Sequence, residues 1–229
     1  MSTSTTPLPA AVLWDMDGTI LDTEPLWDIA MIELAARRGL QMTPELREST
    51  LGNAMTDALT RVYDAAGLPG EKREYMADAR WLLDRVAELF GDGLPWRPGA
   101  PEALELVTVQ GVPMALVTNT VRELTDVALD TIGVGRFSAS VCGDEVARAK
   151  PHPDPYLRAA ALLGVEPAQC LVIEDSPTGA AAAAAAGIPA LVVPSAAPVD
   201  PASGRTLRPT LTGLTAADLA VAAAATPAR

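Results

Sequence analysis

Short apolar runs alternate along the chain with stretches in which apolar residues recur at helical spacing. The runs are four to six residues long and mostly valine, leucine, isoleucine and alanine, which is typical of strands buried on both faces of a parallel sheet. They cover residues 11–14, 112–117, 139–142, 170–173 and 190–193. The candidate helices between them cover residues 101–110, 121–131, 153–163 and 177–186. This alternation predicts an α/β fold with a doubly wound parallel sheet.

One long region between the first and second apolar runs breaks this alternation. Residues 26–92 contain no convincing strand, and 20 of these 67 residues are charged, against 26 of the other 162. Apolar residues recur there at helical spacing, at Leu26, Ile29, Ala30 and Leu34 and again at Trp81, Leu82, Val86 and Leu89. We therefore predict an α-helical cap domain at residues 25–93, inserted into a core formed by residues 1–24 and 94–229. Ligands of open α/β sheets bind at the carboxyl ends of the strands, so this insert would cover the site.

Two aspartates directly follow the first apolar run. Asp15 and Asp17 are separated by one residue, so in an extended chain their side chains face the same way. Two close carboxylates repel each other unless a cation or a shared proton relieves the repulsion. Because no histidine lies nearby in the sequence, Mg²⁺, which prefers oxygen ligands, is the natural cation. Taken alone, such a pair more often caps a strand-to-helix turn, because aspartate is common there.

Polar residues also follow later runs. Thr118 and Asn119 end the second run and precede a helix, whose first N–H groups can bind an anion. Lys150 stands before a proline-rich turn that would fix its ammonium group, and Glu174 with Asp175 forms a second acidic pair at the end of another run. Each cluster alone could be a helix cap or a surface turn. The four together predict one site for a metal ion and an anion.

Composition narrows the possible partners. The chain has 17 Lys and Arg against 29 Asp and Glu, a formal net charge of −12, which disfavours nucleic acid and anionic membranes. One histidine and two cysteines exclude a His-rich or all-thiolate metal site. The uncharged stretch 176–199 contains four prolines and reads as helix, break and strand, not as a membrane span. The first fourteen residues lack Lys and Arg, so we expect no secretory signal and a cytoplasmic protein. The oligomeric state is not readable, and a monomer is compatible with the sequence.

At these four clusters the sequence resembles the haloacid dehalogenase-like (HAD) hydrolase superfamily, in the β-phosphoglucomutase-like phosphatase branch that carries a small helical cap. The matching stretches are "DMDGT" from Asp15, "VTNT" from Val117, "KPHPDPY" from Lys150 and "VIEDSPTGA" from Val172. Their order and spacing agree with the family, and the resemblance covers nearly the whole chain. It implies a Rossmann-like core with an inserted helical cap.

The resemblance also implies catalytic roles. Asp15 would be the nucleophile that attacks phosphorus and becomes an aspartyl phosphate. Asp17 would be the general acid that protonates the leaving oxygen and then the base that activates water. Mg²⁺ would be held by an Asp15 carboxylate oxygen, the Asp17 backbone carbonyl and the Asp175 carboxylate, with Glu174 supporting them.

For the transferred group, the resemblance implies that Thr118 and the Asn119 backbone hold the phosphoryl oxygens and that Lys150 neutralises their charge. Without such charge stabilisation two anions, carboxylate and phosphate, could not approach each other. The expected substrate is a small phosphorylated metabolite, a sugar or polyol phosphate.

The cap residues separate two reactions of this branch. Trp27, Asn53 and Met55 are expected to face the substrate. β-Phosphoglucomutase-like mutases typically have a histidine at the place of Trp27 and an arginine in the stretch that here reads Leu51-Gly52-Asn53-Ala54-Met55, where no arginine follows until Arg61. A mutase must hold a second phosphate in the cap, so the apparent lack of basic groups favours simple hydrolysis, with a phosphosugar mutase as the alternative.

An alternative of another class is a non-catalytic phospho-aspartate switch module. Signalling receiver domains also combine an aspartate, a threonine or serine and a lysine on a doubly wound sheet. However, a receiver is about half this length and has no helical insert. It also lacks a second aspartate that serves as an acid, the position held here by Asp17.

Overall fold

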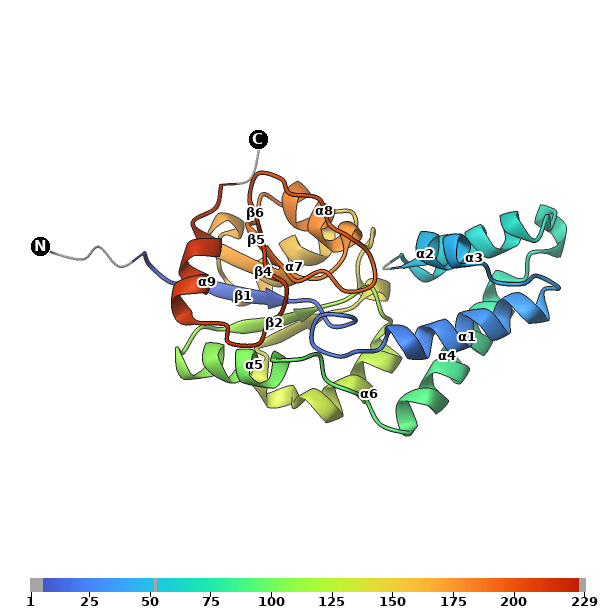
Figure 1. Ribbon diagram of the computed structural model, residues 1–229, viewed down its shortest axis with the longest axis horizontal. Coiled ribbons are helices and arrows are strands. Elements are labelled where there is room, and N and C mark those ends of the chain that lie inside the picture. The colour runs from blue at the N-terminus through green and yellow to red at the C-terminus, as the bar shows by residue number, and fades with distance from the viewer. Residues whose placement is uncertain (1–5, 52, 227–229) are drawn as a thin grey trace, which may run out of the picture.

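The computed structural model describes residues 6–51 and 53–226, which form a sheet core and a group of helices at one edge of it (Figure 1). In the described part of the chain, six parallel strands form one sheet in the order β3-β2-β1-β4-β5-β6. The strands are β1 (Ala11–Trp14), β2 (Met114–Val117), β3 (Ala139–Val141), β4 (Cys170–Glu174), β5 (Ala190–Val192) and β6 (Arg205–Leu207). The reversal of strand order beside β1 is the topological switch point at which ligands of such sheets bind.

Helices cover both faces of the sheet and bury the alternating side chains of its strands. One face, with Val12 and Trp14 of β1, packs against α5 (Ala100–Val109), α6 (Arg122–Ile132) and α9 (Ala216–Ala223). The other face, with Ala11 and Leu13, packs against α7 (Asp154–Leu163) and α8 (Pro177–Ala185). The predicted doubly wound α/β core is therefore confirmed.

The register of the central strands determines where the polar clusters meet. Trp14, the last residue of β1, pairs with Leu116 of β2 on one side and with Ile173 of β4 on the other. The three strands therefore end at nearly the same level, and the residues that follow them lie along one edge of the sheet.

The helices α1 (Glu24–Arg37), α2 (Pro44–Thr50), α3 (Met55–Ala65) and α4 (Tyr75–Gly91) form the predicted helical cap, which lies beyond the carboxyl edge of the sheet (Figure 1). Asp78 is a buried acid of its interior, and it accepts hydrogen bonds from Tyr63 Oη at 2.6 Å and from Arg38 Nε at 2.6 Å. An ion pair between Arg80 of α4 and Glu123 of α6 joins cap and core at 2.9 Å. The helical insert is confirmed, whereas its boundaries at residues 25 and 93 stay a prediction.

The segment after β5 contains structure that the hydrophobic pattern did not predict. The strand β6 has only three residues, of which none is buried, and it lies at the edge of the sheet. No helix in the described part of the chain is long and apolar enough to cross a membrane.

Candidate active site

The chain turns sharply after β1, and Gly18 makes that turn possible. Its φ of +79° lies in the left-handed region that favours glycine. A Cβ atom at this position would also collide with Oδ2 of Asp175. The glycine therefore lets the loop after β1 and the end of β4 approach each other, which brings Asp15 and Asp175 to one place.

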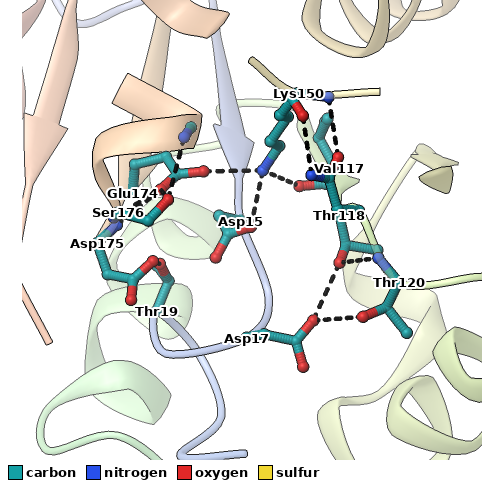
Figure 2. A network of polar contacts seen from close by, with 12 residues as sticks. Asp15, Asp17, Thr19, Val117, Thr118, Thr120, Lys150, Glu174, Asp175 and Ser176 are labelled. Atoms are coloured by element: carbon teal, nitrogen blue, oxygen red, sulfur yellow. Dashed lines mark hydrogen bonds and ion pairs between the residues drawn. The ribbon is translucent and has the colours of Figure 1, made fainter. Parts of the chain in front are cut away.

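Lys150 is the centre of the polar network at this edge (Figure 2). Its ammonium group donates to Asp15 Oδ1 at 2.7 Å, to Glu174 Oε1 at 2.8 Å and to the backbone carbonyl of Val117 at 2.8 Å. The residue is buried, with 3% of its surface exposed. Burial opposes the positive charge, but the carboxylates of Asp15 and Glu174 outweigh that effect and hold the pKa of Lys150 well above its usual value.

The side chain of Asn119 holds the backbone of Lys150. Asn119 Nδ2 donates to the carbonyl of Lys150 at 3.1 Å, and the Lys150 N–H donates to Asn119 Oδ1 at 2.9 Å. Asn119 was predicted to bind phosphate through its backbone, and its side chain has the separate task of positioning the lysine.

Glu174 is fully buried, and both of its carboxylate oxygens are engaged. Besides Lys150, Oε1 accepts a hydrogen bond from Tyr156 Oη at 3.0 Å, and Oε2 accepts from the N–H groups of Asp175 at 2.9 Å and Ser176 at 3.0 Å. Burial disfavours its charge, but Lys150 outweighs this and lowers the pKa of Glu174. With its oxygens occupied, Glu174 is suited to hold its neighbours in place.

Asp17 points away from Lys150, toward the loop after β2 (Figure 2). Its Oδ2 accepts hydrogen bonds from the hydroxyls of Thr118 at 3.1 Å and Thr120 at 2.7 Å, and its Oδ1 accepts from Thr23 at 2.6 Å. Asp15 and Asp17 are therefore held in different surroundings, one beside an ammonium group and one among three hydroxyls. The Thr118 hydroxyl, predicted to hold phosphoryl oxygens, donates to Asp17 in this arrangement.

Three carboxylates at this edge could hold a metal ion. One oxygen from each of Asp15, Glu174 and Asp175 lies within 4.8 Å of the others. Asp15 Oδ2 is buried and has no hydrogen-bond partner among the described residues, which is the state expected of an atom that a cation would complete. With one ammonium group for three carboxylates, the cluster has two surplus negative charges that a divalent cation would balance. The residues present thus fit Mg²⁺, an ion that prefers oxygen ligands.

The same surplus of negative charge, together with burial, shifts the pKa values of the cluster. Burial raises the pKa of Asp15 to about 8, and the charge of Glu174 adds to that shift. Burial also raises the pKa of Asp175 well above its usual value, again with a contribution from Glu174. The Asp175 carboxylate is oriented by the hydroxyls of Thr19 and Ser195. A bound divalent cation would favour the charged forms and oppose both shifts.

A pocket lies between this polar edge and the cap. It is lined by the site residues of the core and by the three predicted cap residues Trp27, Asn53 and Met55. The structure therefore brings all of the predicted site residues to one pocket.

The cap also contributes a basic residue to the pocket, which the sequence did not predict. Arg47 of α2 lines the wall together with Glu24 of α1, and Arg47 Nη2 lies 2.8 Å from Glu24 Oε2. The inference that the cap brings no basic group near the site is therefore wrong. It failed because it considered only the position of Trp27 and the stretch from Leu51 onward, whereas Arg47 lies between them.

Other contributors could not be identified from the strand ends alone. Tyr156 follows Lys150 by six residues and reaches Glu174 only because α7 turns it back toward the sheet. Ser195 comes from the loop after β5, and Thr23 is the residue before α1. Thr120 comes from the bend after β2, where its N–H also donates to the Thr118 hydroxyl.

Comparison with known proteins agrees with these motifs. The family model of haloacid dehalogenase-like hydrolases matches residues 9–187. The chain is 32% identical over 188 residues to hexitol phosphatase B of Escherichia coli (strain K12), which covers 81% of this chain and 83% of that protein. It is also 32% identical over 179 residues to the phosphorylated carbohydrates phosphatase of Thermotoga maritima, which covers 78% of this chain and 82% of that protein.

A similar solved structure is that of CbbY from Rhodobacter sphaeroides in complex with xylulose-(1,5)bisphosphate. The two share 25% sequence identity with a TM-score of 0.77, over 90% of this chain and 96% of that one. The family match includes all four polar clusters described above. The chain therefore belongs to the haloacid dehalogenase-like hydrolases.

Proposed function

We propose that this hydrolase is a Mg²⁺-dependent phosphatase that releases phosphate from a small phosphorylated metabolite through an aspartyl-phosphate intermediate. The observation that carries the proposal is the state of the Asp15 carboxylate. One oxygen is held by Lys150 at 2.7 Å, while the other is buried and has no partner among the described residues. A carboxylate fixed in this way, at the base of a pocket, is suited to attack a phosphorus atom placed above it.

The two aspartates have different roles in the proposed reaction. Asp15 forms a bond to phosphorus as the bond to the leaving oxygen breaks, and Asp17 donates a proton to that oxygen. In the second step Asp17 takes a proton from water, the water oxygen attacks phosphorus, and the Asp15 carboxylate leaves. The three hydroxyls around Asp17 can hold its carboxylate in position between these steps.

Mg²⁺ would be held by the carboxylates of Asp15 and Asp175 and by the Asp17 backbone carbonyl, with Glu174 behind them. When bound, it supplies positive charge that lets the anionic carboxylate and phosphate approach each other. Lys150 supplies a fixed positive charge on the other side of Asp15. Thr118 and the Asn119 backbone would hold the phosphoryl oxygens, the Thr118 hydroxyl changing partner from Asp17 to phosphate.

The proposed leaving group is a sugar or polyol. Two of the similar curated proteins are named as phosphatases of hexitols and of phosphorylated carbohydrates, which supports this class. The cap half of the pocket, with Trp27, Asn53 and Met55, offers an aromatic ring, an amide and a thioether to such a group.

Release of inorganic phosphate from a panel of sugar and polyol phosphates, with and without Mg²⁺, tests the proposal. Asp15→Asn is the matched control, because it keeps the shape of the side chain and removes the nucleophile. If the wild type releases no more phosphate than this variant from any member of the panel or from p-nitrophenyl phosphate, the proposal fails. Stable phosphorylation of Asp15 without turnover would instead support a phospho-aspartate switch.

One observation bears on the mutase alternative. Arg47 is the cap cation that a second phosphate would need, and its presence in the pocket favours that reading more than the sequence did. The guanidinium is already paired with two carboxylates, however, those of Glu24 and Asp28. Conversion of β-glucose 1-phosphate to glucose 6-phosphate without release of inorganic phosphate would establish mutase activity in place of hydrolysis.

A further inference from the structure

Two charged side chains of the cap line the pocket and have no role in the proposed reaction. Glu24, the first residue of α1, and Arg47, in the middle of α2, both line the pocket. Their side chains are only 18% and 13% exposed. Burying charged groups to this extent costs free energy unless they are paired. Glu24 and Arg47 therefore need compensating contacts or have a function in the pocket.

Arg47 is held by three neighbouring side chains. Its Nη2 lies 2.8 Å from Glu24 Oε2, and its Nε lies 2.5 Å from Asp28 Oδ1, one turn further along α1. Its Nη1 donates to Thr50 Oγ1 at 3.0 Å. One guanidinium is thus matched by two carboxylates, and the group formed by Glu24, Asp28 and Arg47 has a net charge of −1 when both acids are ionised.

This net negative charge affects which chemical groups can bind in the cap half of the pocket. A second phosphate or a carboxylate on the substrate would meet no free cation there, and it would lie close to the charge of Glu24. A hydroxyl group has no such conflict. Glu24 Oε1 has no hydrogen-bond partner among the described residues and can accept one from a hydroxyl. Arg47 has five N–H donors, of which its contacts with Glu24, Asp28 and Thr50 use three.

We propose that Glu24, Asp28 and Arg47 form a charge-selective subsite, which accepts a neutral, hydroxyl-bearing leaving group and rejects one that carries a second anionic group. Glu24 and Arg47 would contact the leaving group, whereas Asp28 acts through Arg47 as a positioning residue. Rejection comes from leaving an anion unpaired beside a carboxylate, which discriminates more strongly than an added favourable contact. The inference rests on the proposed phosphatase function and adds that the leaving group carries no second anionic group.

A matched pair of substrates tests it. Glucitol 6-phosphate and 6-phosphogluconate have the same open carbon chain and one phosphate each, and they differ at the far end by a hydroxymethyl group against a carboxylate. The measurement is the ratio of their kcat/KM values with Mg²⁺ at pH 8, because burial raises the pKa of Glu24 to about 7 and the side chain is charged above that value. We expect the wild type to prefer glucitol 6-phosphate by about tenfold or more.

Substitutions should move this ratio in opposite directions. Glu24→Gln removes one negative charge and should reduce the preference for glucitol 6-phosphate by about tenfold, and Asp28→Asn should reduce it by about threefold. Arg47→Gln leaves both acids unopposed and should increase the preference. Asp28→Asn does not alter a pocket-lining side chain, so its effect separates released charge from lost contacts with the hydroxyls.

Arg85→Gln is the matched control. Arg85 is also a cap arginine bound to two glutamates, Glu33 at 2.8 Å and Glu88 at 3.0 Å, but it does not line the pocket. Its substitution should leave the ratio unchanged. Hydrolysis with a ratio that Glu24→Gln and Asp28→Asn do not change would overturn the subsite and leave the phosphatase intact. Absence of hydrolysis of every phosphate ester by the folded wild type would overturn the proposed function and the subsite with it.

Discussion

The ammonium group of Lys150 lies 2.7 Å from one oxygen of Asp15, and the other oxygen of that carboxylate is buried without a partner among the described residues. The lysine therefore fixes the orientation of the acid and leaves its second oxygen for the cation that the acidic cluster is proposed to hold. Because Glu174 and the Val117 carbonyl take the other two N–H groups of Lys150, the ammonium group has no freedom to turn away.

Replacing Lys150 by methionine keeps most of the volume and removes the charge. We expect kcat for any accepted phosphate ester to fall by at least about 100-fold, because the transition-state charge loses a fixed, buried cation. Phosphate release under saturating Mg²⁺ measures this. A circular dichroism melt shows whether the variant is folded. A folded variant with activity within about tenfold of the wild type would contradict the role given to Lys150.

Mg²⁺ should stabilise the protein through the acidic cluster. A ligand that binds only the folded state adds about 2.7 kcal/mol at a hundredfold excess over its Kd. For a chain of this length, Tm rises by about 2–4 °C for each kcal/mol. We expect the rise on adding Mg²⁺ to be lost in Asp15→Asn and Asp175→Asn. It should persist in Asp92→Asn, which changes an exposed aspartate. An equal rise in all four proteins would exclude the cluster as the binding site.

Replacing Asp78, a buried acid of the cap, should lower the free energy of unfolding of the protein. Asp78 accepts hydrogen bonds from Tyr63 and Arg38. Asp78→Ala leaves a buried hydroxyl and a partly buried guanidinium without this partner, at a cost of about 3 kcal/mol, whereas Tyr63→Phe should cost only about 1 kcal/mol. Urea unfolding curves give both values. A smaller loss for Asp78→Ala than for Tyr63→Phe would show that the acid is not the centre of this network.

The charge of Glu24 should make stability depend on pH. Burial raises its pKa from 4.5 to about 7, although Arg47 opposes the shift. A carboxyl group whose folded-state pKa is raised favours folding at low pH, where it is protonated, and this advantage is lost as pH rises through 7. The free energy of unfolding of Glu24→Gln relative to the wild type should therefore rise by up to about 3 kcal/mol between pH 4 and pH 8.5. Metal-free urea unfolding at several pH values tests this, and a flat difference would contradict it.

The sequence predicted most of the core because its strands are buried on both faces. A buried parallel strand is a short run of apolar residues, and β1, β2, β4 and β5 are all of this kind. The edge strand β6 (Arg205–Leu207) is partly exposed and polar, so nothing in the hydrophobic pattern separates it from a loop. It forms because β5 offers an unpaired edge, which is a property of the assembled sheet.

The sequence predicted the site residues of the core because they lie at the ends of strands. Asp15, Thr118 and Glu174 come together because they lie at the carboxyl ends of three neighbouring strands that end at nearly the same level. Glu24 and Arg47 lie on different helices of the cap, 23 residues apart, and come together only through the packing of α1 and α2. No local pattern encodes that distance, and this is why the basic residue of the cap was not predicted.

The sheet core and the helical insert contribute different residues to the pocket. Asp15, Thr118 and Glu174 lie at the carboxyl ends of three adjacent strands at the centre of the sheet, whereas Glu24, Trp27 and Arg47 belong to helices inserted at a single point after β1. Mutations in the insert can therefore accumulate without disturbing the strand ends. A related enzyme could change its substrate by exchanging the insert alone, and a chimera that carries the insert of a relative should keep the turnover chemistry and acquire that relative's preference.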